Sequence, residues 1–436
     1  MASLADGSPI QPPPAESHEG PGAATIHSLG EDLLLVIFLR LPNLAALVRA
    51  ALTCRAWRRA VASSPAFRRR FRALHPAPLL GFFFGAPGPV RTPNLPAFAT
   101  FAPARPADRD MAAAVRGGDF FLTSLQARPD AEPCWDIIDC CRGYGLFTNS
   151  EEGWLVVLNP LTRRSEYFIH THFVNFFEGS CGQRRPIELN ARLLCSEEDP
   201  KSFRVVLLAL DDSRVRANVF SSDTEEWSVL PWVGIPAPIR SDDTNHWLQN
   251  EGGMLANGFL YWLYKDRRYL ISLDTATMEF SVAQLPQCLS RCVFDVSETK
   301  DGATCIVYSD QLNVGVMMHT RGDDGVDRWV LDRVVPLGRE IERVLRDGLW
   351  DGSLLISLVD SPSELVVLAV RDGYAYLATS VHDPQSPCWF LSLCLETMKL
   401  EKLFRRTFDL DVYPYIMAWP PSLLGNYGRF ALEDAP

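Results

Sequence analysis

The fold is decided first by residues 27–42, which read HSLGEDLLLVIFLRLP. Ser28 and Glu31 have the spacing of a capping box, in which each side chain bonds a free backbone N–H of a starting helix. The sequence therefore predicts a helix from about Leu29, and Pro42 cannot continue it. The apolar residues of this helix recur at intervals of three and four, as in an apolar stripe. They are Leu33, Leu34, Ile37, Phe38 and Leu41.

Three more short helices are predicted before residue 75. Asn43 is a favourable N-cap for a helix over residues 44–51, and Ser64-Pro65 is a cap followed by proline at the first helical position. Between them, Trp57 and Val61 lie one helical turn apart. The last helix has an apolar face of its own, formed by Phe67, Phe71 and Leu74.

A set of four short helices is close to the lower size limit for independent folding. A domain of about 50 residues buries too small a fraction of its surface to be stable without further contacts. The apolar surface of residues 27–75 is also larger than so small a core can cover. We therefore expect this segment to pack against something else, either the following domain of the same chain or a partner protein.

The segment resembles an F-box. In F-box proteins the early leucines, the isoleucine one turn later, the Leu-Pro turn and the Cys-Arg-x-Trp element form the surface that docks on a Skp-type adaptor, and through it on a cullin. The resemblance implies adaptor contacts at Leu29, Leu33, Leu34, Ile37, Leu41, Pro42, Leu44, Cys54, Arg55 and Trp57. Gly30 departs from the pattern, because the family usually has proline there, and it is expected to loosen the helix start and to weaken docking.

From about residue 79 the sequence changes to short apolar runs separated by turn residues, which predicts a β-rich domain. One imperfect unit recurs: an apolar strand, a polar turn, a second strand and then an aromatic or aliphatic strand. Five copies span residues 143–168, 203–231, 258–286, 305–331 and 374–400. A weaker sixth copy is expected within residues 79–125, with strands near Leu80–Phe84 and Phe120–Leu122.

These units predict a β-propeller. Each is a small antiparallel sheet that cannot bury both faces alone, and their spacing fits propeller blades of roughly 40–50 residues with insertions. The predicted chain is thus an α+β multidomain protein with a small N-terminal all-α F-box helical module and an all-β domain of about six degenerate blades; a β-sandwich is the alternative. The predicted domains are a disordered leader (1–26), the F-box (27–75) and the propeller (76–436). The pattern is similar to kelch-like or F-box-associated propellers of plant F-box proteins, although most copies lack the kelch Gly-Gly doublet.

Composition narrows the function classes. The chain has 436 residues, 47% hydrophobic and 22% charged, and its longest strongly apolar run is far shorter than the roughly 18 residues of a membrane helix. Residues 31–75 carry a net charge of +7 within a chain of −11, but no base-stacking aromatics accompany the arginines. The 11 cysteines have irregular spacing without zinc-ligand pairs, which favours a reducing compartment. We expect no membrane, nucleic acid, metal or cofactor, and a cytoplasmic or nuclear location.

The sequence favours a non-catalytic function. It contains no nucleophile elbow, zinc-protease motif or phosphate-binding loop, and His170-Thr-His172 has no third metal ligand at a suitable spacing. Because Trp and Tyr dominate binding hot spots, aromatics near turns are the candidates for target contact. The three selected are Trp247, Tyr264 and Tyr144.

The resemblance implies the substrate-recognition subunit of an SCF-type E3 ubiquitin ligase, with the F-box on the adaptor and the propeller on a target protein. Two alternatives stay open. One is a non-catalytic interaction scaffold that is not assembled into a ligase, and the other is a propeller enzyme, which would need carboxylates or metal ligands converging on the central channel.

Overall fold

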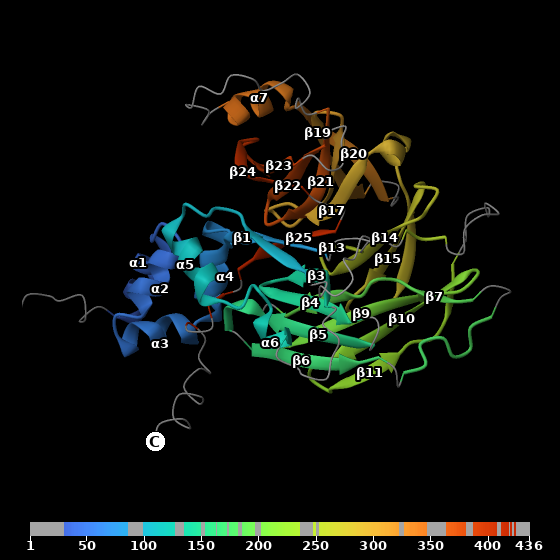
Figure 1. Ribbon diagram of the computed structural model, residues 1–436, viewed down its shortest axis with the longest axis horizontal. Coiled ribbons are helices and arrows are strands. Elements are labelled where there is room, and N and C mark those ends of the chain that lie inside the picture. Colours follow the sequence, from blue (N-terminus) through green and yellow to red (C-terminus); the bar gives the residue numbers. More distant parts are fainter. Residues whose placement is uncertain are drawn as a thin grey trace, which may run out of the picture.

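The protein was analysed as a computed structural model, which describes residues 30–85, 99–126, 135–149, 153–162, 164–171, 174–181, 185–196, 202–235, 247–249, 253–321, 327–346, 363–380, 387–407, 411–417, 419–420 and 423. A helical domain is followed by six small antiparallel sheets arranged around a common centre (Figure 1). The predicted leader, residues 1–26, lies outside the described residues.

Four helices form the helical domain: α1 (Glu31–Leu39), α2 (Leu44–Ala51), α3 (Arg55–Ser63) and α4 (Pro65–Leu74). Two of the three predicted caps are confirmed. The Asn43 side chain accepts the N–H of Ala46 at 2.9 Å, and the Ser64 hydroxyl accepts the N–H of Phe67 at 3.2 Å. Each cap satisfies a donor that the first turn of a helix would otherwise leave free, which is why the helices begin at these residues.

The start of α1 differs from the prediction. The helix begins at Glu31 instead of Leu29, and Gly30 is its N-cap, with φ −59° and ψ 150° and no side-chain cap bond. Ser28 and Leu29 lie outside the described residues. Two acidic residues in the first turn, Glu31 and Asp32, interact favourably with the positive end of the helix dipole.

The six sheets divide the strands as follows. The first contains β1 (Leu79–Phe84), β2 (Thr100–Pro103) and β25 (Val412–Ile416), and the second β3 (Asp136–Cys141), β4 (Tyr144–Asn149), β5 (Trp154–Asn159) and β6 (Arg164–His170). The third contains β7 (Ile187–Glu188), β8 (Arg192–Cys195), β9 (Phe203–Leu210), β10 (Arg214–Ser221), β11 (Glu226–Val229) and β12 (Val233–Gly234). The fourth contains β13 (Met254–Ala256), β14 (Phe259–Leu263), β15 (Tyr269–Asp274) and β16 (Phe280–Gln284).

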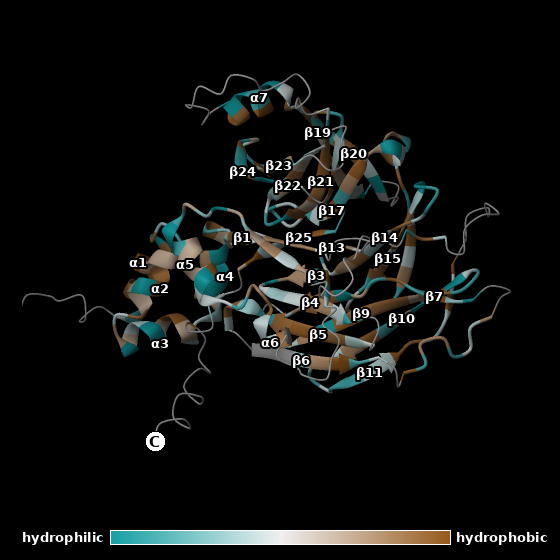
Figure 2. Cartoon of the chain, viewed as in Figure 1, coloured by the Kyte–Doolittle hydropathy of each residue, from teal (hydrophilic) through white to brown (hydrophobic). Residues whose placement is uncertain are grey.

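The fifth sheet contains β17 (Val293–Glu298), β18 (Thr304–Asp310), β19 (Asn313–Arg321) and β20 (Asp327–Pro336), and the sixth β21 (Glu364–Arg371), β22 (Tyr374–Ser380), β23 (Cys388–Cys394) and β24 (Leu400–Arg406). Among the described residues, three α-helices lie between strands: α5 (Arg109–Gly117), α6 (Thr123–Gln126) and α7 (Gly338–Arg346). The apolar character of strands such as β5 and β9 is visible in Figure 2.

The sheets close into a six-bladed propeller, as predicted, and a sandwich is not favoured. Inner strands of neighbouring sheets are in contact, namely β25 with β3, β3 with β8, β13 with β17, β17 with β21, and β21 with β25. The third and fourth sheets share one hydrophobic core. Each of the five clear repeat units corresponds to the outer three strands of a blade, and the inner strand of that blade lies before the unit in the sequence.

The first blade corrects one prediction. Phe120–Leu122 does not form a strand but lies just before α6, and Leu122 has a positive φ of 55°. The blade is instead completed by β25 from the other end of the sequence, which pairs antiparallel with β1 and places Tyr413 opposite Phe83. The ring is thus closed by strands from the two ends of the propeller sequence.

Two buried carboxylates tie neighbouring blades together at the inner strands. Asp139 on β3 accepts the backbone N–H of Leu193 on β8, and Asp295 on β17 accepts that of Val370 on β21, both at 2.7 Å. Each also pairs with an arginine on the strand that donates this N–H: Asp139 with Arg192 of β8 at 3.2 Å, and Asp295 with Arg371 of β21 at 3.1 Å. A buried charge is tolerated only when it is paired and hydrogen-bonded, so each carboxylate holds its own inner strand against that of the next blade.

The core of the helical domain includes residues from the C-terminal part of the chain. Trp419 and Leu423 are 4% and 0% exposed and pack with residues of all four helices. The Trp419 ring meets the ring of Phe71 edge to face, with 5.9 Å between centroids. Just before them, the Met417 N–H donates to the Pro78 carbonyl at 3.0 Å. The segment that follows β25 therefore joins the propeller to the helical domain, which lies beside the first blade (Figure 1).

Candidate functional site

Helix α1 has two apolar faces, and only one of them is covered. Leu34 and Phe38 point into the helical core, where the Phe38 ring meets Trp57 edge to face with 5.5 Å between centroids. On the other side of the helix Leu33, Val36 and Ile37 are 59%, 46% and 40% exposed. A soluble helix normally carries polar residues on its outer face, so a second apolar face points to a partner surface.

The residues of the exposed face form one continuous stripe. The spacing from Leu33 to Val36 and Ile37 is three and four, which places the three side chains side by side along one face of a helix. Leu52, at the C-terminal end of α2, is a further exposed leucine of the same domain, 49% exposed. We refer to Leu33, Val36 and Ile37 as the α1 stripe.

The structure sorts the predicted adaptor contacts into three groups. Leu33, Ile37 and Pro42 are exposed, as is Arg55, while Leu41, Cys54 and Trp57 are partly buried. Leu34 and Leu44 are buried in the helical core, so they would support the surface and not form it. Leu29 lies outside the described residues.

Two exposed residues were missed by the sequence reasoning. Val36 and Leu52 were not among the predicted contacts, although the spacing of Val36 from Leu33 gave a usable signal. Helix α1 is apolar on all sides. The inner pair Leu34 and Phe38 has the same four-residue spacing as the outer pair Leu33 and Ile37. Periodicity alone therefore could not decide which of the two stripes faces inward. Leu74, predicted to share an apolar face with Phe67 and Phe71, is exposed while the two phenylalanines are buried.

The predicted target-binding aromatics lie mainly inside the blades. Tyr264 is completely buried and Tyr144 is nearly so. Burial raises the pKa of Tyr264 to about 12. Trp247 is partly buried, and its indole N–H donates to the Asp211 carbonyl at 3.0 Å. Of the three, Trp247 leaves the most ring surface for contact with another protein, and target binding by these residues stays a prediction.

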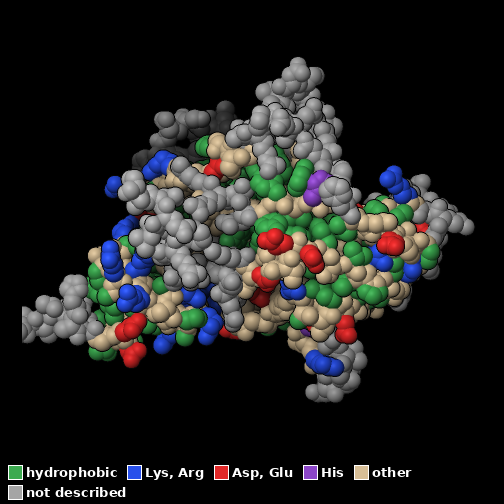
Figure 3. Space-filling view, turned by 90° about the horizontal axis from the view of Figure 1, so that it is seen from below, with side chains coloured by type: hydrophobic (Ala, Val, Ile, Leu, Met, Phe, Trp, Pro, Cys, Tyr) green, Lys and Arg blue, Asp and Glu red, His purple; other side chains and the backbone are tan. Residues whose placement is uncertain are grey.

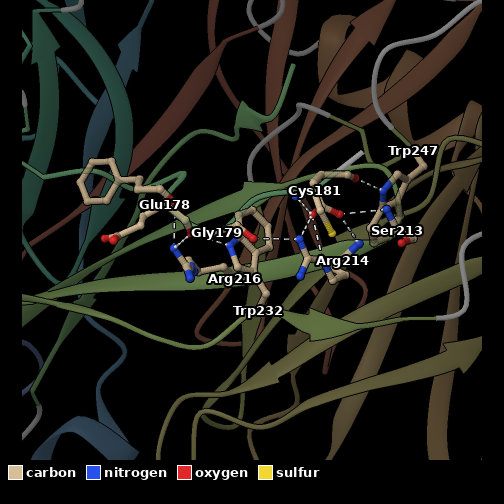
Figure 4. A network of polar contacts seen from close by, with 10 residues as sticks. Glu178, Gly179, Cys181, Ser213, Arg214, Arg216, Trp232 and Trp247 are labelled. Carbon is tan, nitrogen blue, oxygen red and sulfur yellow. Dashed lines mark hydrogen bonds and ion pairs between the residues drawn. The ribbon is translucent and has the colours of Figure 1, made fainter. Parts of the chain in front are cut away.

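A polar network holds the surface around Trp247 (Figure 4). The Asp211 carboxylate accepts the N–H groups of Cys181, Ser213 and Arg214 at 3.2, 3.1 and 2.9 Å, together with the Arg214 guanidinium. Burial raises the pKa of the Asp211 carboxyl, but these hydrogen bonds outweigh the effect of burial and hold the pKa below its usual value. The carboxylate is therefore stabilised in its charged form.

Two arginines of β10 extend the network to an outer tryptophan. The guanidinium carbons of Arg214 and Arg216 lie 5.2 and 4.7 Å from the centroid of the Trp232 ring. The Trp232 indole and the Arg216 guanidinium both donate to the Glu178 carbonyl at 2.9 Å. The segment before β7 is thus tied to β10 and held in a fixed position near Trp247 (Figure 4).

Replacing Asp211 by alanine is expected to lower the free energy of unfolding by about 2–3 kcal/mol, since hydrogen bonds to charged groups contribute most. The folded pKa of the carboxyl is depressed, so this contribution is present above the unfolded value and is lost as the pH falls through the folded pKa. Urea unfolding at pH 7 should show the difference, and the gap between the two proteins should narrow on acidification. Asp223→Ala, at an exposed turn, is the control, and an equal loss there would contradict the assignment.

Comparison with known protein families gives two matches. The family described as "F-box protein AT5G49610-like, beta-propeller" matches residues 136–423, which is more than half of the chain, and an F-box-like family matches residues 26–73. The chain belongs to the AT5G49610-like F-box proteins. In this F-box protein the F-box-like match spans the described helices α1–α3 and most of α4, and the propeller match begins at β3 and ends at Leu423.

Solved structures similar to this F-box protein show distant likeness. A putative 6-phosphogluconolactonase from Bacteroides fragilis is 12% identical, with a TM-score of 0.31 over 62% of this chain and 68% of the other. The N-terminal domain of Nup159 is 12% identical, with a TM-score of 0.28 over 64% and 60%. The WD40 domain of SCAP from fission yeast is 9% identical, with a TM-score of 0.26 over 59% and 48%. The search of curated proteins found no match.

The described residues offer neither a membrane-spanning helix nor a metal-binding cluster. Among them, none of the helices is both long and apolar enough to cross a membrane. The same residues contain no group of three or more His, Cys, Asp or Glu side chains placed to hold a metal ion. His172, one of the two histidines weighed as metal ligands, lies outside the described part of the F-box protein.

Proposed function

We propose that this F-box protein is the substrate-recognition subunit of an SCF-type E3 ubiquitin ligase. In this proposal the α1 stripe of the F-box-like domain binds a Skp-type adaptor and through it a cullin, while the propeller binds a target protein. The observation that carries the proposal is the exposure of Leu33, Val36 and Ile37 on a helix whose opposite face is already buried. An F-box-like domain implies such an adaptor.

The proposed role of the chain is non-catalytic. Holding a target lysine near a ubiquitin thioester raises its effective concentration, and this proximity alone accelerates transfer. The propeller suits the task because ion pairs with buried carboxylates join the second blade to the third and the fifth to the sixth, which favours a fixed surface for the target. A ligase of this kind would act in the cytoplasm or the nucleus.

The test uses the full chain and a purified Skp-type adaptor. Size-exclusion chromatography and calorimetry are expected to show a stable complex, and addition of the cullin module is expected to extend it to a larger assembly. A chain that folds but binds no adaptor would overturn the proposal and favour an interaction scaffold outside any ligase. A complex with the adaptor that excludes the cullin would also contradict it.

A further inference from the structure

Lysine is rare in this chain and absent from its first 200 residues. The sequence contains 37 arginines but only five lysines, at positions 201, 265, 300, 399 and 402. The two residue types are interchangeable as solvated positive charges at an exposed site, but they differ as nucleophiles. The lysine amine can be acylated and is the target of ubiquitination, whereas the arginine guanidinium is not deprotonated in proteins and so has no free lone pair.

The helical domain carries its positive charge on arginine alone. Figure 3 shows Lys and Arg side chains gathered at the end of the molecule that holds the helical domain, and the sequence makes all of those in this domain arginine. Arg59, Arg69 and Arg70 are exposed, and within the described part of the chain they make no ion pair or side-chain hydrogen bond. Their geometry therefore does not require a guanidinium, and a lysine would serve these positions equally well.

The described lysines lie on the last three blades. Lys300 pairs with Glu396 at 3.2 Å, and Lys399 pairs with Glu401 at 3.0 Å. Lys402 lies over the Trp389 ring, 5.2 Å from its centroid. Lys265, in the turn after β14, is partly buried. The helical domain and the first two blades, by contrast, offer no lysine amine at all.

We propose that the absence of lysine from residues 1–200, the lysine-free region, protects the receptor from modification by its own ligase. The inference rests on the proposed function. In such a ligase the receptor is held in the same complex as the charged conjugating enzyme, so any accessible receptor amine within reach of the thioester would compete with the amine of the target. Arginine at these positions keeps the positive charge but removes the competing acceptor.

The reaction that the arginines would avoid is transfer of ubiquitin to a lysine amine of the receptor. A lysine amine attacks the thioester carbonyl that joins ubiquitin to the conjugating-enzyme cysteine; a C–N isopeptide bond forms and the C–S bond breaks. The cysteine leaves as thiolate, and the proton lost by the amine is available to it. A protonated guanidinium has no lone pair to begin this attack, so exposed arginines stay unmodified.

The test introduces acceptors without changing charge. Arg69→Lys with Arg70→Lys on α4, and Arg109→Lys with Arg116→Lys on α5, place lysines at exposed positions of the full chain. In a ligase reconstituted with adaptor, cullin and charged conjugating enzyme, self-ubiquitination is expected to rise at least about threefold over wild type. Mass spectrometry should find the new ubiquitin remnants at the introduced lysines. The matched glutamine variants should not differ from wild type.

The outcomes separate this inference from the proposed function. If wild-type chain binds no adaptor, the proposed function fails and this inference fails with it. If the ligase assembles and forms ubiquitin chains, but neither lysine variant is modified more than wild type, the inference alone is overturned. Unchanged thermal unfolding of the variants would establish that a gain in modification does not come from a loosened fold.

Discussion

Replacing Leu33 and Ile37 together by aspartate is expected to abolish capture of a Skp-type adaptor. Both side chains are exposed in the free chain, so the change should leave folding intact, whereas in the proposed complex both would be buried. Losing two buried aliphatic side chains and burying carboxylates in their place costs about 4 kcal/mol or more, which corresponds to about a thousandfold weaker binding. Calorimetry with the purified adaptor measures the loss directly.

The control variant introduces the same two aspartates at another exposed apolar pair, far from α1 in the sequence. Val330 and Leu331 on β20 are 50% and 53% exposed, so the double aspartate variant there adds the same charge to an equally exposed apolar pair. It should bind the adaptor as wild type does. If the β20 variant loses binding equally, or if the α1 variant keeps wild-type affinity, the α1 stripe is not the adaptor contact.

Local sequence chemistry was sufficient to predict the helices of the helical domain. The caps at Asn43 and Ser64 are short-range features, since each side chain bonds a backbone N–H three residues away. The same reasoning failed at the start of α1, where Gly30 and not Ser28 precedes the helix. A capping box is only a spacing, and the backbone can begin the helix two residues later at little cost.

The blades were predictable where strands follow one another along the chain. Strands joined by short turns repeat the same local pattern, and the outer three strands of five blades were recognised by it. Pairing between distant segments leaves no local signal, so the partnership of β1 with β25 was missed. The burial of Tyr264 has a similar origin, because a tyrosine beside a turn can face the core or the solvent with the same neighbours in sequence.

The candidate adaptor site was predicted only in part, again because local sequence does not show which side chains face the core. A resemblance in sequence marks which residues recur in F-boxes, but not which of them face outward in this chain. Leu34 and Leu44 proved to be core residues, while Val36 joined the exposed stripe. The apolar character of α1 on all sides required the structure to separate its two faces.

Replacing Trp419 by alanine is expected to unfold the helical domain while the propeller stays folded. The ring fills the core between the helices, meets Phe71 and lies under the Arg72 guanidinium, 5.6 Å from its centroid. Truncating a buried tryptophan costs about 3–5 kcal/mol, and a domain of about 50 residues has little more than this to lose. Hydrogen exchange should show lost protection in α1–α4 and unchanged protection in the blades, and adaptor affinity should fall with it.

Two further substitutions separate this role from general damage. Trp419→Phe keeps an aromatic ring in the core, and because the buried indole N–H has no hydrogen-bond partner among the described residues, phenylalanine loses no bond to them. It should retain most of the protection of α1–α4. Trp389→Ala, at a partly buried tryptophan on β23, should leave the helical domain unchanged. Full protection of α1–α4 in Trp419→Ala would mean that the helical domain folds without the C-terminal segment, and that its direction relative to the propeller is set by other contacts.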